Sequence, residues 1–70
     1  MTATDLRHLP PPGPMEHILD ALATLSAGET ISFVLPHHPL PLYPLLEAEG
    51  ARWRCELSGD GGVIIHIDKA

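Results

Sequence analysis

The sequence predicts a small α+β domain, a two-layer α/β sandwich in which two helices cover one face of a four-stranded mixed sheet in the order βαβαββ. Three observations predict this fold. Several segments alternate polar and apolar residues, as half-buried strands do. Two other segments repeat apolar residues every three or four positions, as amphipathic helices do. All eight prolines fall in two clusters, and each cluster stands directly before a helical segment, where proline is accepted in the first turn.

The first half of the chain predicts a strand, a helix and a second strand. Residues 4–7 are predicted as a short first strand, although they contain a single apolar residue. After the first proline cluster, apolar residues from Met15 to Leu25 recur at helical spacing, and Gly28 is expected to stop this helix in a left-handed conformation. Residues 29–35 then alternate polar and apolar side chains, which predicts a strand with one buried face.

The second half predicts a shorter helix and a hairpin. Leu42, Leu45 and Leu46 repeat the apolar stripe over about two turns after the second proline cluster, and Gly50 is expected to end this helix. Residues 52–57 and 63–68 alternate as strands, and the glycine-rich residues 58–62 between them predict the turn of a hairpin.

The alternation also assigns side chains to the two faces of the sheet. Trp53, Cys55 and Leu57 are expected to point toward the helices together with the apolar residues of the neighbouring strands. The opposite face is expected to be mostly polar and open to water. It would carry Thr30, Ser32, Val34, Arg52, Arg54, Glu56, Ile64 and His66. Because Val34 and Ile64 are apolar, we expect a monomer or a weak homodimer.

Length and composition limit the classes of function. Seventy residues of which 44% are hydrophobic make one folded domain, residues 1–70, without the large core of a big enzyme. The net charge of -5 argues against nucleic-acid binding. No apolar run is long enough to span a membrane, and no secretory leader is recognisable. A single cysteine cannot form an internal disulfide, so we expect a cytoplasmic protein.

The proline motifs carry a resemblance to known families. Residues 5–14, Asp-Leu-Arg-His-Leu-Pro-Pro-Pro-Gly-Pro, resemble the opening motif of the TusA/SirA-like sulfur carriers, with Pro11 at the position of the family cysteine. The whole chain resembles more closely the bacterial domain-of-unknown-function family 2249, a TusA-like relative. The features that match are Leu9 to Pro12, the Leu25-to-Gly28 stop, the segment His38-Pro39-Leu40-Pro41-Leu42-Tyr43, and Trp53.

The resemblance implies a fold but little function. It implies the strand order 1-2-4-3, with the last strand antiparallel to the others. Because the sulfur-carrying cysteine is missing at Pro11, it implies no enzyme activity of the sulfur-carrier kind. Function therefore has to be argued from the site itself.

One end of the predicted sheet is the candidate site. The first two strands both end where a helix begins, so both proline loops, the hairpin turn and both helix N-termini are expected at one rim. We expect this rim to bind a protein partner or a small anionic ligand without catalysis and without a cofactor. The residues expected to make the contact are Arg7, His8, Pro10, Pro11, Pro12, Gly13, Pro14, His37 and His38.

Two alternatives from other classes remain open at this point. The first is a redox- or metal-handling protein that uses His8, His37 and His38, because imidazole is a common metal ligand. We assign no metal site, since neither loop contains a carboxylate and adjacent histidines tend to point apart. The second is a sulfur-transfer component, in which Cys55 would have to carry the sulfur. We assign no catalytic residue, because a thiol packed among apolar side chains is a poor nucleophile.

Overall fold

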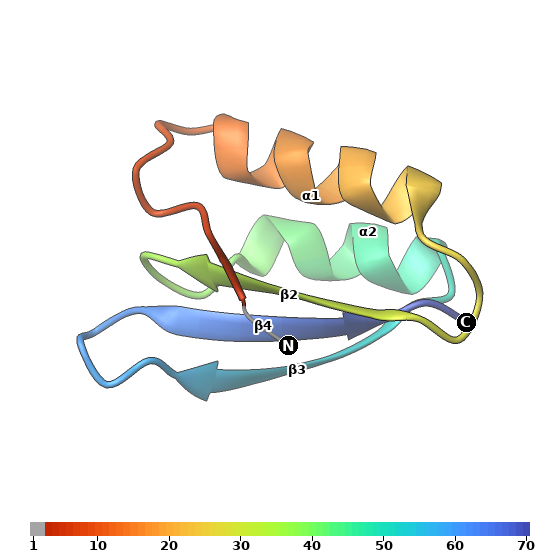
Figure 1. Cartoon of the computed structure of the whole chain (residues 1–70). Coiled ribbons are helices and arrows are strands. Elements are labelled where there is room, and N and C mark those ends of the chain that lie inside the picture. The colour runs from red at the N-terminus through yellow and green to blue at the C-terminus, as the bar shows by residue number, and fades with distance from the viewer. Residues whose placement is uncertain (1–2) are drawn as a thin grey trace.

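The computed structural model describes residues 3–70, and its elements follow the predicted order βαβαββ. The helices α1 and α2 lie on one face of a four-stranded sheet (Figure 1). The strands are ordered β1-β2-β4-β3 across the sheet, as the resemblance implied. The elements are β1 (Thr4–Asp5), α1 (Gly13–Thr24), β2 (Thr30–Leu35), a 3₁₀ turn (Leu40–Leu42), α2 (Tyr43–Ala48), β3 (Arg52–Leu57) and β4 (Val63–Asp68).

The sheet is mixed, with its fourth strand running against its neighbours. β1 pairs parallel with β2, whereas β4 pairs antiparallel with both β2 and β3 over six residues each. β1 is shorter than predicted and ends at Asp5 rather than Arg7. The reason is local, because the Asp5 carboxylate accepts a hydrogen bond from the Arg7 backbone N–H at 2.9 Å and so holds the chain in a turn.

The first helix begins at the proline cluster and ends earlier than predicted. Pro14 lies in its first turn, and Ile18 and Leu22 are buried against the sheet. The helix stops at Thr24, because Leu25 already has an extended backbone. Gly28 does adopt a positive φ of 86°, but it does so in a separate tight turn before β2 and does not cap the helix.

The second helix has the predicted glycine stop. The chain enters it through the 3₁₀ turn, so α2 itself is only six residues long. Gly50 has a φ of 73°, and its N–H donates to the carbonyl of Glu47 at 3.0 Å. The Ala51 N–H donates to the carbonyl of Leu46, also at 3.0 Å, which completes a Schellman motif.

The core lies between the helices and the inner face of the sheet. It consists of Leu6, Ile18, Leu22, Phe33, Leu35, Leu42, Leu46, Ala51, Ile65 and Ile67. Half-buried Trp53 and Cys55 pack against it, as the alternation predicted. The alternation assigns Leu57 to the same face, but the expectation that the helices cover it is wrong, because this residue is 76% exposed. Leu57 is the last residue of a strand at the sheet margin, beyond the cover of the described helices.

Two neighbouring leucines of α2 test this packing directly. Leu46 is fully buried and Leu45 is 39% exposed. We expect Leu46→Ala to lower the free energy of unfolding by about 2–5 kcal/mol, because it removes buried methyl groups and leaves a cavity. We expect Leu45→Ala to lower it by less than about 1 kcal/mol. Urea unfolding followed by circular dichroism measures both, and equal losses would contradict the assigned core.

Candidate functional site

Three loops lie together at one end of the sheet, as the sequence predicted. They are the segment between β1 and α1, the segment between β2 and the 3₁₀ turn, and the β3–β4 hairpin (Figure 1). Residues from the first two loops line a common pocket. The hairpin is connected to the same end by an ion pair between Arg7 and Asp60.

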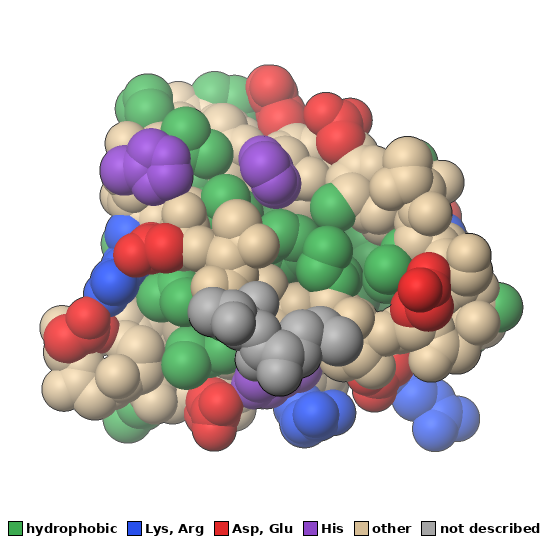
Figure 2. Space-filling view, in the orientation of Figure 1, with side chains coloured by type: hydrophobic (Ala, Val, Ile, Leu, Met, Phe, Trp, Pro, Cys, Tyr) green, Lys and Arg blue, Asp and Glu red, His purple; other side chains and the backbone are tan. Residues whose placement is uncertain are grey.

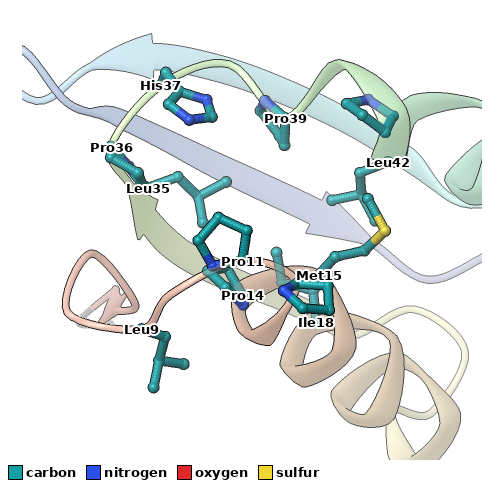
Figure 3. A pocket seen from close by; sticks show the side chains of 12 residues that line it. Leu9, Pro11, Pro14, Met15, Ile18, Leu35, Pro36, His37, Pro39 and Leu42 are labelled. Carbon is teal, nitrogen blue, oxygen red and sulfur yellow. The ribbon is translucent and has the colours of Figure 1, made fainter.

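The pocket is an apolar hollow of about 240 Å³ between the two proline loops. Side chains of the α1 end and of the facing loop border the same space (Figure 3). Leu35 contributes from the end of β2, and Met15 and Ile18 contribute from α1. The full lining is Leu9, Pro11, Pro12, Pro14, Met15, Ile18, Leu35, Pro36, His37, Pro39, Pro41 and Leu42.

The chemistry of this lining favours an apolar occupant. His37 contributes the one side chain of the lining that carries polar atoms, and the lining contains neither lysine nor arginine. The proline rings have fixed backbone φ angles, so the shape of the pocket is largely preformed. A preformed pocket binds with a smaller loss of conformational entropy than a mobile one. The pocket therefore suits an apolar side chain better than the small anion considered from the sequence.

Arg7 forms the polar part of the same end, next to the hairpin. Its Nη2 and Nε donate to the two carboxylate oxygens of Asp5 at 2.8 and 3.0 Å, and its Nη1 donates to Asp60. Figure 2 shows basic and acidic side chains adjoining at this end of the molecule. These bonds occupy the guanidinium from both sides. Arg7 thus joins two loops, and two carboxylates already balance its charge, which makes it a weak site for an added anion.

This network shifts the pKa of each partner. The side-chain hydrogen bond from Arg7 lowers the pKa of Asp5 to about 2, and the backbone N–H of Arg7 adds to the effect. The Ser58 hydroxyl, followed by Arg7 and the Gly62 N–H, holds the pKa of Asp60 well below its ordinary value. The hydrogen bonds to Asp5 and Asp60 raise the pKa of Arg7 further above its ordinary value. Both carboxylates are therefore charged at neutral pH.

The structure brings only part of the predicted contact set into the pocket. Four of the nine residues, Pro11, Pro12, Pro14 and His37, line it. His8 and Pro10 are exposed outside the lining, and Gly13 begins α1. Arg7 is in the ion-pair network, and His38 points to Tyr43 instead. The predicted set left out the other eight lining residues, among them Leu9, Met15, Ile18 and Leu35, whose apolar character fits a core position as well as a pocket wall.

Tyr43 connects His38 to Cys55 by a chain of hydrogen bonds that the sequence did not reveal. The Tyr43 hydroxyl lies 3.2 Å from His38 Nδ1 and 3.2 Å from Cys55 Sγ. The ring of Tyr43 stacks on Trp53 with centroids 5.4 Å apart. Burial, with a contribution from the bond to Cys55, raises the pKa of Tyr43 to about 12. Cys55 is half-buried rather than fully buried, and it lies outside the pocket lining.

His66 forms a second chain of hydrogen bonds on the helix-free face of the sheet. Its Nδ1 lies 2.7 Å from the Ser32 hydroxyl, and its Nε2 lies 2.9 Å from a carboxylate oxygen of Glu56. Sequence reasoning took His66 for an ordinary surface residue, but its side chain is only 21% exposed and joins three strands. Ser32 is itself buried, so this chain stabilises the sheet and does not present a nucleophile.

The three histidines named for metal binding do not converge. Among residues 3–70, no group of three or more histidine, cysteine, aspartate or glutamate side chains has the arrangement of a metal site. His37 faces the pocket, while His38 is engaged with Tyr43. Within the same range, neither α1 nor α2 combines the length and apolar character that a bilayer-crossing helix requires.

Fold and site together define a small α+β domain with an apolar pocket between two proline-rich loops. The family model described as "Uncharacterized conserved protein (DUF2249)" matches residues 3–69, so the chain belongs to this family. No curated protein and no solved structure matches the chain. The family description names no activity, and the function has to come from the site.

The Arg7 network predicts a specific loss of stability in acid. Because the pKa of Asp5 falls from 3.8 to about 2 on folding, its contribution to stability is full above about pH 4 and disappears as the pH falls toward 2. Asp60 has the same sign. We expect Arg7→Gln to lose less stability than the native chain between about pH 5 and pH 2. Urea unfolding at a series of pH values measures this, and parallel curves for both proteins would contradict the network.

The surroundings of Cys55 predict slow thiol chemistry. The thiol is half-buried and in contact with Tyr43, so we expect a disulfide reagent to label it at least about tenfold more slowly than an exposed thiol. The matched control is the double variant Cys55→Ser/Leu40→Cys, because Leu40 is 67% exposed. Labelling is followed by absorbance on the folded proteins. Equal rates would contradict the packing and favour the sulfur-transfer alternative.

Proposed function

We propose that this domain is a non-catalytic binding module that inserts an apolar side chain of a partner protein into its proline-walled pocket. The observation that carries the proposal is the pocket itself, an apolar hollow of about 240 Å³ between two stiff loops. Its size lies below the 300–1,000 Å³ or so of sites for drug-sized ligands. It is larger than the roughly 150 Å³ cavity in which an engineered protein binds benzene. One large side chain is an occupant of suitable size.

The surface around the pocket supports a protein partner over a free small molecule. Apolar surface continues beyond the hollow, since Leu40 and Pro10 are exposed outside its lining and Pro11 and Pro41 are exposed within it. An exposed apolar rim around a pocket is typical of protein interaction sites, where the rim is covered as the anchor enters. The Arg7 network with Asp5 and Asp60 lies at the same end and offers a polar margin for such an interface.

Peptide selection tests the proposal with a defined probe. A random peptide library displayed on phage is selected against the native domain, and enriched peptides are synthesised. We expect them to share one large apolar residue whose replacement by alanine weakens binding by at least about tenfold. We expect the domain variant Met15→Glu to lose this binding, because it places a charge in the apolar lining.

The controls separate loss of the pocket from loss of the fold. Glu16→Gln changes the next residue, which is exposed on α1, and is expected to bind like the native chain. A nuclear magnetic resonance titration with toluene, against one with sulfate, reports on the pocket without any peptide. Toluene should shift the amide signals of Leu9, Met15 and His37. Enriched peptides without an apolar anchor, or pocket signals that respond to sulfate alone, would overturn the proposal.

A further inference from the structure

The outer margin of β3 is a strand edge that, among residues 3–70, pairs with no other strand. It extends over six residues, Arg52–Leu57, and such an edge offers unpaired N–H and C=O groups to another strand. The register with β4 shows which groups these are. The Ser58 N–H donates to the Gly62 carbonyl at 3.0 Å, and bonded pairs alternate along an antiparallel ladder. The backbone groups of Trp53, Cys55 and Leu57 therefore point outward.

The side chains of these three residues form an apolar strip on the inner side of the same edge. Leu57 is the most exposed of the large hydrophobic residues in the described chain, at 76%. Trp53 and Cys55 are half-buried and lie next to it on the same face of the strand. An uncovered apolar residue beside an unpaired strand edge indicates a place where another chain adds to the sheet.

We propose that two copies of this chain associate through antiparallel pairing of their β3 strands, with Cys55 of one copy opposite Cys55 of the other. In this register the outward backbone groups of Trp53 and Leu57 pair with those of the second copy's Leu57 and Trp53. Each of these backbone pairs joins two residues whose outward N–H and C=O groups have no strand partner among residues 3–70 of their own copy. Leu57 of each copy covers Trp53 of the other, and the two four-stranded sheets become one continuous sheet.

Charge selects this register among those that the backbone permits. On the helix-free face it places Arg54 of each copy directly opposite Glu56 of the other, so the symmetric edge contains this ion pair twice. A shift by two residues in one direction places Arg52 opposite Glu56 twice but adds Arg54 opposite Arg54, and a shift in the other direction places Glu56 opposite Glu56. A shift by one residue leaves outward groups without partners. Figure 2 shows basic and acidic side chains mixed along the margin where Figure 1 places β3.

The existing contacts of these two side chains leave them available. Glu56 uses one carboxylate oxygen for His66, and the other oxygen has no hydrogen bond within the described residues. Arg54 lies 3.6 Å from Asp68 with a side chain that is largely exposed. Both therefore contribute to the interface by adding a partner, without breaking the bonds that hold β3 to β4.

Sedimentation equilibrium of the full chain, combined with charge reversal, tests the interface. The native protein should be in concentration-dependent equilibrium between monomer and dimer. Arg54→Glu and Glu56→Arg each place like charges opposite one another twice, and each should weaken association at least about tenfold. An equal mixture of the two variants restores both opposite-charge pairs and should form a heterodimer about as tightly as the native chain.

Two controls complete the test. Arg52→Glu makes the same change of net charge as Arg54→Glu, but Arg52 faces the neutral Ser58 of the second copy, so association should stay within about threefold of native. Because Cys55 is half-buried, a short bis-maleimide should link the native chain through Cys55 slowly, and the yield of linked dimer should fall further in Arg54→Glu. A native chain that stays monomeric at millimolar concentration, or two variants that fail to associate when mixed, would overturn the proposed dimer.

Discussion

The pairing of β2 with β4 is the interaction on which the rest of the structure depends. All six residues of each strand take part, and the pair of Phe33 and Ile65 at its centre is fully buried under the helices. β2 also supports the short β1, and β4 supports β3. A chain of 70 residues buries only about three fifths of its unfolded surface, and the core between helices and sheet is the single hydrophobic cluster of the described residues 3–70. The pocket lies at the end of β2, and the β3 edge is joined to the pair through β4.

This arrangement of strands explains both the position of the pocket and the composition of its walls. β1 and β2 run parallel, so the loop that leaves each strand for its helix lies at the same end of the sheet. Proline is tolerated in both loops because each enters a helix, and it removes conformational freedom from a domain with little stability to spare. The same residues that stiffen the entrances also form apolar walls. The same prolines therefore contribute both to stability and to a preformed binding surface.

The proposed binding pocket and the proposed dimer edge lie at different parts of the molecule and use different physics. The pocket lining is apolar and concave, and its selectivity comes from shape. The β3 edge offers backbone hydrogen bonds and charges of both signs, so its selectivity comes from register. Association through β3 would leave the proline loops free, because Leu57 and Trp53 are outside the pocket lining. A dimer would then present two pockets on one continuous sheet.

Local patterns were enough to predict most elements of the fold. Alternation predicted the buried faces of β2 and β4, and Gly50 predicted the end of α2, since both depend on residues close in sequence. The errors arose where distant groups compete with local preference. Gly28 lies in a turn in which its N–H donates to the Lys69 carbonyl, and it does not end the helix. Leu57 lies on the predicted face of its strand, but no helix covers it. Neither outcome is visible in a window of a few residues.

For the site, the sequence by itself determined that two proline loops and the hairpin meet at one end, because parallel strands joined by helices must place their exits together. Only the tertiary structure decided what that end is made of. Arg7 donates hydrogen bonds to Asp5 and Asp60, and His38 lies within hydrogen-bond distance of Tyr43. Met15 and Leu35 line the pocket. These contacts join residues far apart in the chain, and their side-chain directions depend on how helices pack on the sheet.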